Sequence, residues 1–470
     1  MSNIATRTSS GILLGAPERP RSAVHWIALA LVWVSVASGA VVFTEPAPVD
    51  LLTMGLIVAL PIVGLVAIRP SLLIYLSIWL MAAAGAFVAT MHSYDVARSA
   101  IHSGISVYLY AASFVFAAFI VRRPESHSRL IMHAYLWAAF IAAVAGVVGY
   151  FGLMPGAAEL FTKFGRAAGT FKDPNVYGPF LIPALLYALS LVITRPARKA
   201  LVPAVMLLFL AFAVLLSFSR GAWVALAVAV AVYGYLSFVT APTNRHRLKL
   251  VVLAVLGIFA TAVGLMLAMQ FDSVGDLLAK RAELTQTYDE GSEGRFGGHA
   301  KARRVILDNP LGIGALMFAE RHHSEDVHHV YLAMFMNAGW IGGLVFILMT
   351  GITVLYGLRH AFRRTLTQPV FLVAYAAFLA HALEGFVIDI DHWRHYYLLM
   401  ALVWGLMVGD RQIASLTMRR PRPMRILPDV LVLPPSRPAR IPRLIADNRP
   451  RPHPRPRRIG LRRPAGVTVH

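Results

Sequence analysis

The chain alternates between long apolar runs and short polar connectors. Runs of about 20 apolar residues can cross a bilayer as helices, and they recur through most of the sequence. Because these runs lack a polar face, burial in a soluble core does not explain them. Hydropathy therefore predicts an all-α, polytopic membrane protein of about 12 transmembrane helices, near residues 24–43, 51–68, 71–90, 101–121, 130–151, 176–194, 201–216, 222–239, 250–269, 329–358, 370–388 and 396–408.

Composition agrees with this fold class. The 470 residues are 57% hydrophobic and only 14% charged, whereas a soluble domain carries roughly 25% charged residues. There is no cysteine, which excludes disulfides and thiolate chemistry.

Polar stretches divide the chain into parts. Residues 1–23 form an expected cytoplasmic segment, 24–410 the transmembrane domain, and 270–327 a large polar loop within it. The tail, 411–470, holds fifteen Arg, two Asp and twelve Pro. It lacks a long apolar run, so we expect it to be disordered and to bind anionic membrane lipid. It also lacks the interleaved aromatics that nucleic-acid binding would use.

Basic residues in the short connectors predict the orientation. Lys and Arg cluster at 122–129, 195–199, 245–249 and 359–364, and such clusters favour the cytoplasmic side. Both termini are then cytoplasmic and the 270–327 loop faces outward. The bases of the outward connectors, Lys163, Arg166, Lys172 and Arg220, are exceptions, and an anionic ligand is one reason to keep them there.

The outward connector at 165–178 has the features of a helix start. Asp173 is placed to cap the helix and Pro174 to occupy its first position. A helix N-terminus favours an anion, and Arg166, Lys172 and Asn175 surround it. The alternative is that both bases only reach toward lipid headgroups.

Three further arginines could bind phosphate. Arg220 lies in a tight break between two apolar runs, and its planar guanidinium suits a phosphate. The alternatives for Arg220 are snorkelling or capping of the preceding helix. Arg303 and Arg304 lie on a predicted short helix, 299–307, ended by Asn309-Pro310. The alternative for this pair is a solvated basic face.

His328 and His329 open an apolar helix whose first turn contains Tyr331. A histidine at a membrane–water boundary can exchange a proton near neutral pH; the alternative is a carbonyl-bonded structural histidine. We expect no metal at 322–329, since these histidines lack a carboxylate or Cys at ligand spacing. The sequence Asp389-Ile390-Asp391 is similar to a metal motif, but we expect a structural pairing with Arg394 or another outward base.

Taken together, these motifs resemble the O-antigen ligase/polymerase family, bacterial inner-membrane proteins with about a dozen spans and one large periplasmic loop. The resemblance covers roughly residues 150–408. It rests on the order of Arg166 before Gly-Thr-Phe and Asp173-Pro174-Asn175, Ser219-Arg220-Gly221-Ala222, Arg303 before Asn309-Pro310-Leu311-Gly312-Ile313-Gly314, and His328-x-x-Tyr331-Leu332 with Gly339 and Gly342.

The resemblance implies glycan transfer from undecaprenyl pyrophosphate, without metal, ATP or other cofactor. Ligases transfer the glycan to a lipid A-core sugar, and polymerases to another repeat unit. The functional residues would be Arg166, Arg220, Arg303 and His328. One departure is His329, where the family usually has Asn, so either histidine could act.

Residue chemistry and resemblance lead to one hypothesis. His328 removes the proton of an acceptor hydroxyl, while Arg166, Arg220 and Arg303 stabilise the departing pyrophosphate. Lys172, Arg304, Tyr331, His329 and Asn175 assist in substrate binding. The alternative functions are a polymerase with the same donor chemistry, a lipid-linked-glycan transporter, and a membrane sensor.

Overall fold

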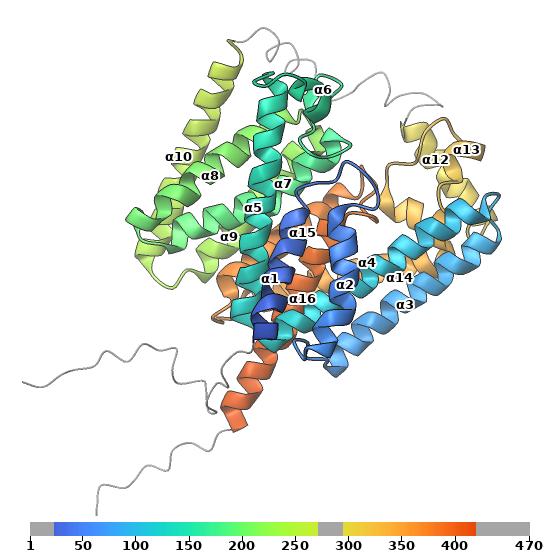
Figure 1. Cartoon of the computed structure of the whole chain (residues 1–470), viewed down its shortest axis with the longest axis horizontal. Helices are drawn as coiled ribbons and strands as arrows, with labels where there is room; N and C mark the ends of the chain where they lie inside the picture. The colour runs from blue at the N-terminus through green and yellow to red at the C-terminus, as the bar shows by residue number, and fades with distance from the viewer. Residues whose placement is uncertain (1–22, 271–294, 420–470) are drawn as a thin grey trace, which may run out of the picture. The chain divides into compact units, whose positions relative to one another are not determined.

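The computed structural model describes residues 23–270 and 295–419, which fold as a bundle of α-helices (Figure 1). Every predicted span corresponds to a helix: α1 (Ala23–Ser38), α2 (Pro48–Ile62), α3 (Pro70–Met91), α4 (Val96–Arg122), α5 (Pro124–Tyr150), α7 (Pro174–Thr194), α8 (Ala197–Leu216), α9 (Arg220–Thr240), α10 (Asn244–Ala268), α14 (Val330–Ala361), α15 (Gln368–Glu384) and α16 (Arg394–Arg419). Shorter elements fill the connectors: α6 (Ala157–Phe161), β1 (Thr162–Lys163), β2 (Arg166–Ala167), α12 (Arg295–Asp308) and α13 (Phe318–Arg321).

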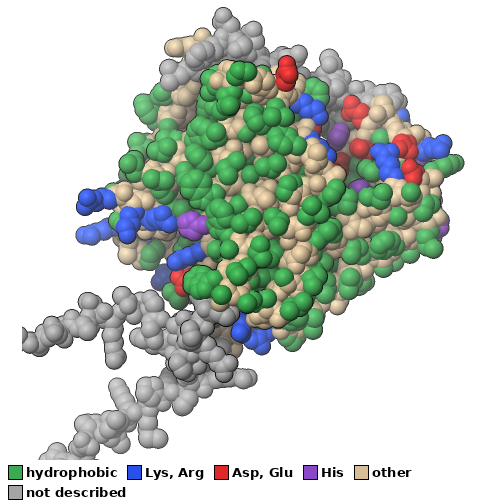
Figure 2. All heavy atoms as spheres, in the orientation of Figure 1, with side chains coloured by type: hydrophobic (Ala, Val, Ile, Leu, Met, Phe, Trp, Pro, Cys, Tyr) green, Lys and Arg blue, Asp and Glu red, His purple; other side chains and the backbone are tan. Residues whose placement is uncertain are grey.

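Length and apolar composition confirm the fold class. Within the described residues, α3, α4, α5, α7, α8, α9, α10 and α14 are long and apolar enough to cross a membrane, and α1, α2 and α15 are shorter apolar helices. Large apolar side chains such as Ile62, Met91 and Ile258 are more than two-thirds exposed. Figure 2 shows such side chains covering a broad face, which suits contact with lipid rather than water.

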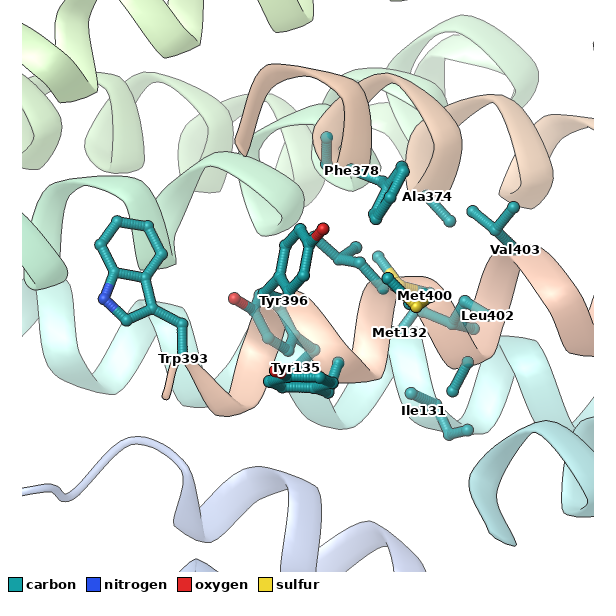
Figure 3. Packing of buried hydrophobic residues seen from close by; sticks show 14 of the residues in the cluster. Ile131, Met132, Tyr135, Ala374, Phe378, Trp393, Tyr396, Met400, Leu402 and Val403 are labelled. Carbon is teal, nitrogen blue, oxygen red and sulfur yellow. The ribbon is translucent and has the colours of Figure 1, made fainter. Parts of the chain in front are cut away.

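The buried core runs through most of the long helices, and one part of it lies where α5, α15 and α16 meet. Figure 3 shows Tyr135 of α5, Phe378 of α15 and Tyr396 of α16 among the side chains packed there. Buried glycines let backbones approach closely; a Cβ on Gly405 of α16 would lie 2.9 Å from the Ala117 carbonyl oxygen of α4. Close approach through small residues is how membrane helices gain packing contacts.

Hydrogen bonds group the helix ends into two sets. At one end, which we name the site end, Val330 N–H donates to Gly385 O at 2.9 Å and Val42 N–H donates to Thr170 O at 3.0 Å. At the opposite end, Asp410 of α16 accepts from Thr367 at 2.6 Å and lies 3.0 Å from His360 Nε2. The starts of α7, α9, α14 and α16 and the C-terminal end of α15 all belong to the site end.

The turn after α12 fits into a break in α14. The predicted short helix is present and begins slightly earlier, at Arg295. Helix α14 is interrupted at Gly339, whose φ is +66°. There Ile313 N–H donates to Met336 O and Trp340 N–H donates to Pro310 O, both at 2.9 Å. The Gly-Ile-Gly motif is thus a packing device that anchors α12 on α14.

Gly312→Ala is expected to loosen this anchor. Gly312 has a φ of +85°, and an added Cβ would lie 2.7 Å from Met336 O and 2.8 Å from Gly339 N. The left-handed conformation alone costs about 1–2 kcal/mol for a residue with a side chain, so the unfolding temperature of the purified protein should fall. Gly351→Ala is the control, since nothing lies within 4 Å of its Cβ. Equal unfolding temperatures for the two variants would contradict this packing account.

Parts of the predicted loop and tail lie outside the described residues, namely 271–294 and 420–470, as does nearly all of the N-terminal segment, 1–22. Helix α16 continues to Arg419. The predicted disorder therefore does not hold for residues 411–419, which extend the last helix.

Candidate functional site

The β1–β2 hairpin and the start of α7 position Arg166 and Asn175. Lys163 and Arg166 are paired in the antiparallel hairpin. Asp173 caps α7 by accepting a hydrogen bond from Asn175 N–H at 2.7 Å, and Pro174 is the first helical residue. The predicted helix start is therefore confirmed, and it places Asn175 in the first turn.

Arg166 is buried, with 5% of its surface exposed. Its Nε donates to Ser217 O and its Nη2 to Asn175 Oδ1, both at 2.8 Å. The alternative that Arg166 reaches toward lipid headgroups is therefore wrong. Its guanidinium ties the start of α7 to the turn between α8 and α9.

The turn that Arg166 holds leads directly into Arg220. Ser219 caps α9, its hydroxyl accepting from Ala222 N–H at 3.4 Å, and Arg220 is the first residue of the helix. Phe218, fully buried, bends the chain with a φ of +46°. Arg166 thus contacts the turn that leads into Arg220, and Arg220 adds its charge to the positive end of α9.

Glu384 at the end of α15 lies against the start of α9. A Cβ on Gly221 would lie 3.1 Å from Glu384 Oε1. The other carboxylate oxygen, Oε2, is 3.3 Å from His381 Nδ1, and both side chains are buried. Sequence analysis missed this residue, although an acidic side chain within an apolar run is itself a signal of function or pairing.

His329 has a structural position at the start of α14. It is the N-cap, and its Nδ1 accepts from Leu332 N–H at 3.3 Å. Its ring packs edge-on against Tyr331, Phe386 and His299. Burial, helped by His299 and Arg303, lowers the pKa of His329, which favours the neutral ring.

His328 instead faces a carboxylate. Its Nδ1 lies 3.6 Å from Asp389 Oδ2, and 39% of its side chain is exposed. Asp389 Oδ1 accepts from His329 N–H at 3.2 Å, which fixes the carboxylate beside the histidine. Burial raises the pKa of Asp389, while its hydrogen bond with His328 acts in the opposite direction. His328 has a φ of +46°, uncommon outside glycine.

Asp389 and Asp391 were expected to pair with Arg394 or another outward base, and the pairing with Arg394 is wrong. Arg394 Nε and Nη2 donate to the two oxygens of Asp50 at 2.6 and 2.7 Å. Both aspartates face histidines instead, since Asp391 Oδ2 lies 3.9 Å from His102 Nε2. The bidentate geometry favours this pair, because two parallel N–H groups of the guanidinium match the two oxygens of one carboxylate.

Helix α12 brings two exposed bases to the same region. His299 Nε2 lies 3.0 Å from Val327 O, just before the two histidines. Arg303, one turn further, is close enough for its charge to affect His329. Arg304 is also exposed. Tyr331, by contrast, donates its hydroxyl to Ala382 O at 2.6 Å and so joins α14 to α15.

A cavity of about 510 Å³ opens beside these residues. Lys172, Arg98 and Asp389 line its polar part, and Ala112, Phe116 and other apolar residues line the rest. Lys172 Nζ lies 3.5 Å from Glu45 Oε1. Figure 2 shows charged and histidine side chains around a hollow between α2 and the α12–α13 segment. Among the described lining residues, Lys172 and Asp389 connect the cavity to the predicted site; Arg166, Arg220, Arg303 and His328 lie outside its wall.

Comparison with known proteins finds a similarity in the central part of the chain. A family model described as O-antigen ligase matches residues 204–347. The match spans α8 to the middle of α14 and contains Arg220, Arg303 and His328. No curated protein matches the chain. The family match confirms the resemblance drawn from the sequence motifs.

Proposed function

We propose that this O-antigen ligase-like protein transfers a glycan from undecaprenyl pyrophosphate to an acceptor hydroxyl at the periplasmic face of the inner membrane. The family match supports glycan transfer of the ligase or polymerase type in general. The observation that carries the finer proposal is the His328–Asp389 pair at the start of α14, beside a cavity with a polar and an apolar part.

In this proposal, His328 is the general base. Its Nδ1 faces Asp389, so Nε2 takes the proton as the acceptor oxygen bonds to the anomeric carbon and the bond to pyrophosphate breaks. Asp389 holds the imidazole in the required tautomer and stabilises the imidazolium that forms, as carboxylates do for histidine bases. A positioned base contributes about 10²–10⁴-fold to the rate.

The basic residues bind the pyrophosphate. Its charge grows as the glycosidic bond breaks, so fixed positive groups stabilise the transition state more than the ground state. Arg220 at the start of α9 and Arg303 on α12 supply this charge, with Lys172 and Arg304 in support. Arg166 and Asn175 position the turn that carries Arg220, because Arg166 donates to Ser217 O as well as to Asn175.

Asp389→Asn tests the carboxylate's part in this arrangement. The amide keeps the size of the side chain but loses its charge. We expect kcat to fall roughly 10²-fold, less than the ~10⁴-fold loss known for a fully buried Asp–His pair, because the atoms here are 3.6 Å apart and partly exposed. Asp308→Asn, an exposed change at the end of α12, is the control. An unchanged kcat in Asp389→Asn would remove Asp389 from the mechanism.

The acceptor decides between ligase and polymerase. Purified membranes would receive a radiolabelled polyprenyl-pyrophosphate glycan, with and without lipid A-core. We propose the ligase reaction, so label should move to lipid A-core. A ladder of polyprenyl-linked products would identify a polymerase instead, and no transfer to any acceptor would reject glycan transfer altogether.

The proposed orientation places the site end in the periplasm and both termini in the cytoplasm. The basic connectors 122–129 and 195–199 lie at the opposite end, as the positive-inside rule favours. Because the chain has no cysteine, single cysteines report their side of the membrane cleanly. A membrane-impermeant maleimide on intact cells should label Glu159→Cys in α6 but not Arg198→Cys in α8. The reverse pattern would invert the topology.

A further inference from the structure

The cavity wall contains a group of side chains that the proposed transfer does not use. His102 comes from the first turns of α4, and Asp391 and His392 come from the connection between α15 and α16. Their ligand atoms all lie within 4.8 Å of one another. The two imidazole rings stack with centroids 3.8 Å apart, and His102 Nε2 is 3.9 Å from Asp391 Oδ2.

The surroundings favour a cation over an ordinary ion pair. Arg394, three residues after Asp391, forms its described ion pair with Asp50 rather than with Asp391. His102 and Asp391 are mostly buried, and a mostly buried carboxylate calls for a partner of opposite charge. Stacked imidazoles cannot both supply that charge without repelling each other. A metal ion satisfies the carboxylate and both neutral imidazoles together.

We propose that His102, Asp391 and His392 form a binding site for a divalent transition-metal ion in the wall of the cavity. Zinc–nitrogen and zinc–oxygen bonds are about 2.0–2.2 Å long, so two of them span up to about 4.2 Å. The 3.9 Å separation between His102 and Asp391 is within that span. The three ligand atoms lie at most 4.8 Å from one another, so any wider pair would close to that span by moving by less than about 1 Å.

Neighbouring groups agree with this assignment. Ser106 Oγ lies 3.0 Å from His392 Nε2, and a polar partner at a ring nitrogen orients metal-binding histidines. All three ligands line the cavity, so the remaining coordination positions face it and suit water or an anionic oxygen. Two histidines and one carboxylate match Zn²⁺, Mn²⁺, Fe²⁺ or Co²⁺. A metal site here departs from the family resemblance, which implies that no metal is needed.

The test measures metal binding directly and so does not depend on transfer activity. Full-length protein without a histidine tag would be stripped with a chelator and titrated with Co²⁺, followed by its visible absorption, and with Zn²⁺, followed by elemental analysis after gel filtration. We expect about one ion per chain. Asp391→Asn and His102→Gln should each weaken binding at least about tenfold, because even the loss of a residue that only orients a ligand typically costs that much. His92→Gln, an exposed histidine bonded to Val88 O, should leave it unchanged.

Two results would overturn the site: wild-type protein that retains no ion, or an ion retained equally by Asp391→Asn and His102→Gln. Should those variants fail to fold, X-ray absorption of the zinc-loaded wild type decides, since the proposal requires two imidazole ligands together with oxygen. A spectrum lacking the two imidazoles would reject it.

Discussion

His328→Ala is expected to lower kcat for glycan transfer by about 10²–10⁴-fold, the contribution of a positioned general base. The physical reason is that the acceptor hydroxyl would keep its proton while its oxygen attacks. His328 is the histidine whose Nδ1 faces the Asp389 carboxylate, at 3.6 Å. Initial rates with purified, normally folded protein at saturating donor would measure the loss, and KM should change little because the base acts in the transition state.

Two other histidines serve as comparisons. His329→Ala removes the cap of α14, so it should cost about 1 kcal/mol of stability and reduce kcat far less than His328→Ala. His92→Ala, at an exposed position near the end of α3, should leave kcat unchanged. If His329→Ala loses transfer while His328→Ala keeps it, the roles of the two histidines are reversed.

Arg220→Ala should be the second large effect, a loss of about 10²–10³-fold in kcat, the usual result of removing one fixed donor to a developing negative charge. Arg220 adds a positive charge where the α9 N-terminus already favours an anion. Arg220→Lys keeps the charge but loses the planar fork, so it should recover only part of the rate. Rates would be measured with the same polyprenyl-pyrophosphate donor.

The matched control is Arg198→Ala, an exposed base near the start of α8 at the opposite end of the helices. It removes the same charge without touching the site, so kcat should be unchanged. Equal losses in Arg220→Ala and Arg198→Ala would mean that overall charge, rather than a specific pyrophosphate contact, explains the effect.

Sequence alone predicted the elements well, because their causes are local. A run of about 20 apolar residues specifies a spanning helix wherever it occurs. The Asp173-Pro174 start of α7 was equally clear, since a cap and its helix are adjacent in the chain. The turn at Asn309-Pro310 ended α12 as expected. Its docking into the α14 break, however, joins residues 23 and 30 positions apart, Ile313 with Met336 and Pro310 with Trp340, and left no local signal.

The site was predicted less completely, because the residues that contact one another in it are distant in the chain. His328 was identified, but the carboxylate beside it, Asp389, was assigned to Arg394 or another outward base, whereas Arg394 binds Asp50 more than 300 residues away. From the sequence alone, Asp389 and Asp50 are both plausible partners of Arg394. Only the packing of α2 against α16 selects Asp50. Tyr331 and His329, predicted as substrate-binding, have hydroxyl and ring contacts within the protein.

Glycan transfer breaks the bond between the glycan and its polyprenyl carrier and forms a bond to the acceptor. A sealed-vesicle experiment detects this change of linkage directly. Purified protein would be reconstituted with a polyprenyl-pyrophosphate donor carrying a labelled glycan, with lipid A-core present, and the label would be followed by both its linkage and its side of the membrane. We predict that label leaves the polyprenyl carrier and becomes joined to the acceptor, and that His328→Ala slows this transfer by about 10²–10⁴-fold. Label that crosses the membrane while still joined to the polyprenyl carrier would contradict glycan transfer and identify a transporter.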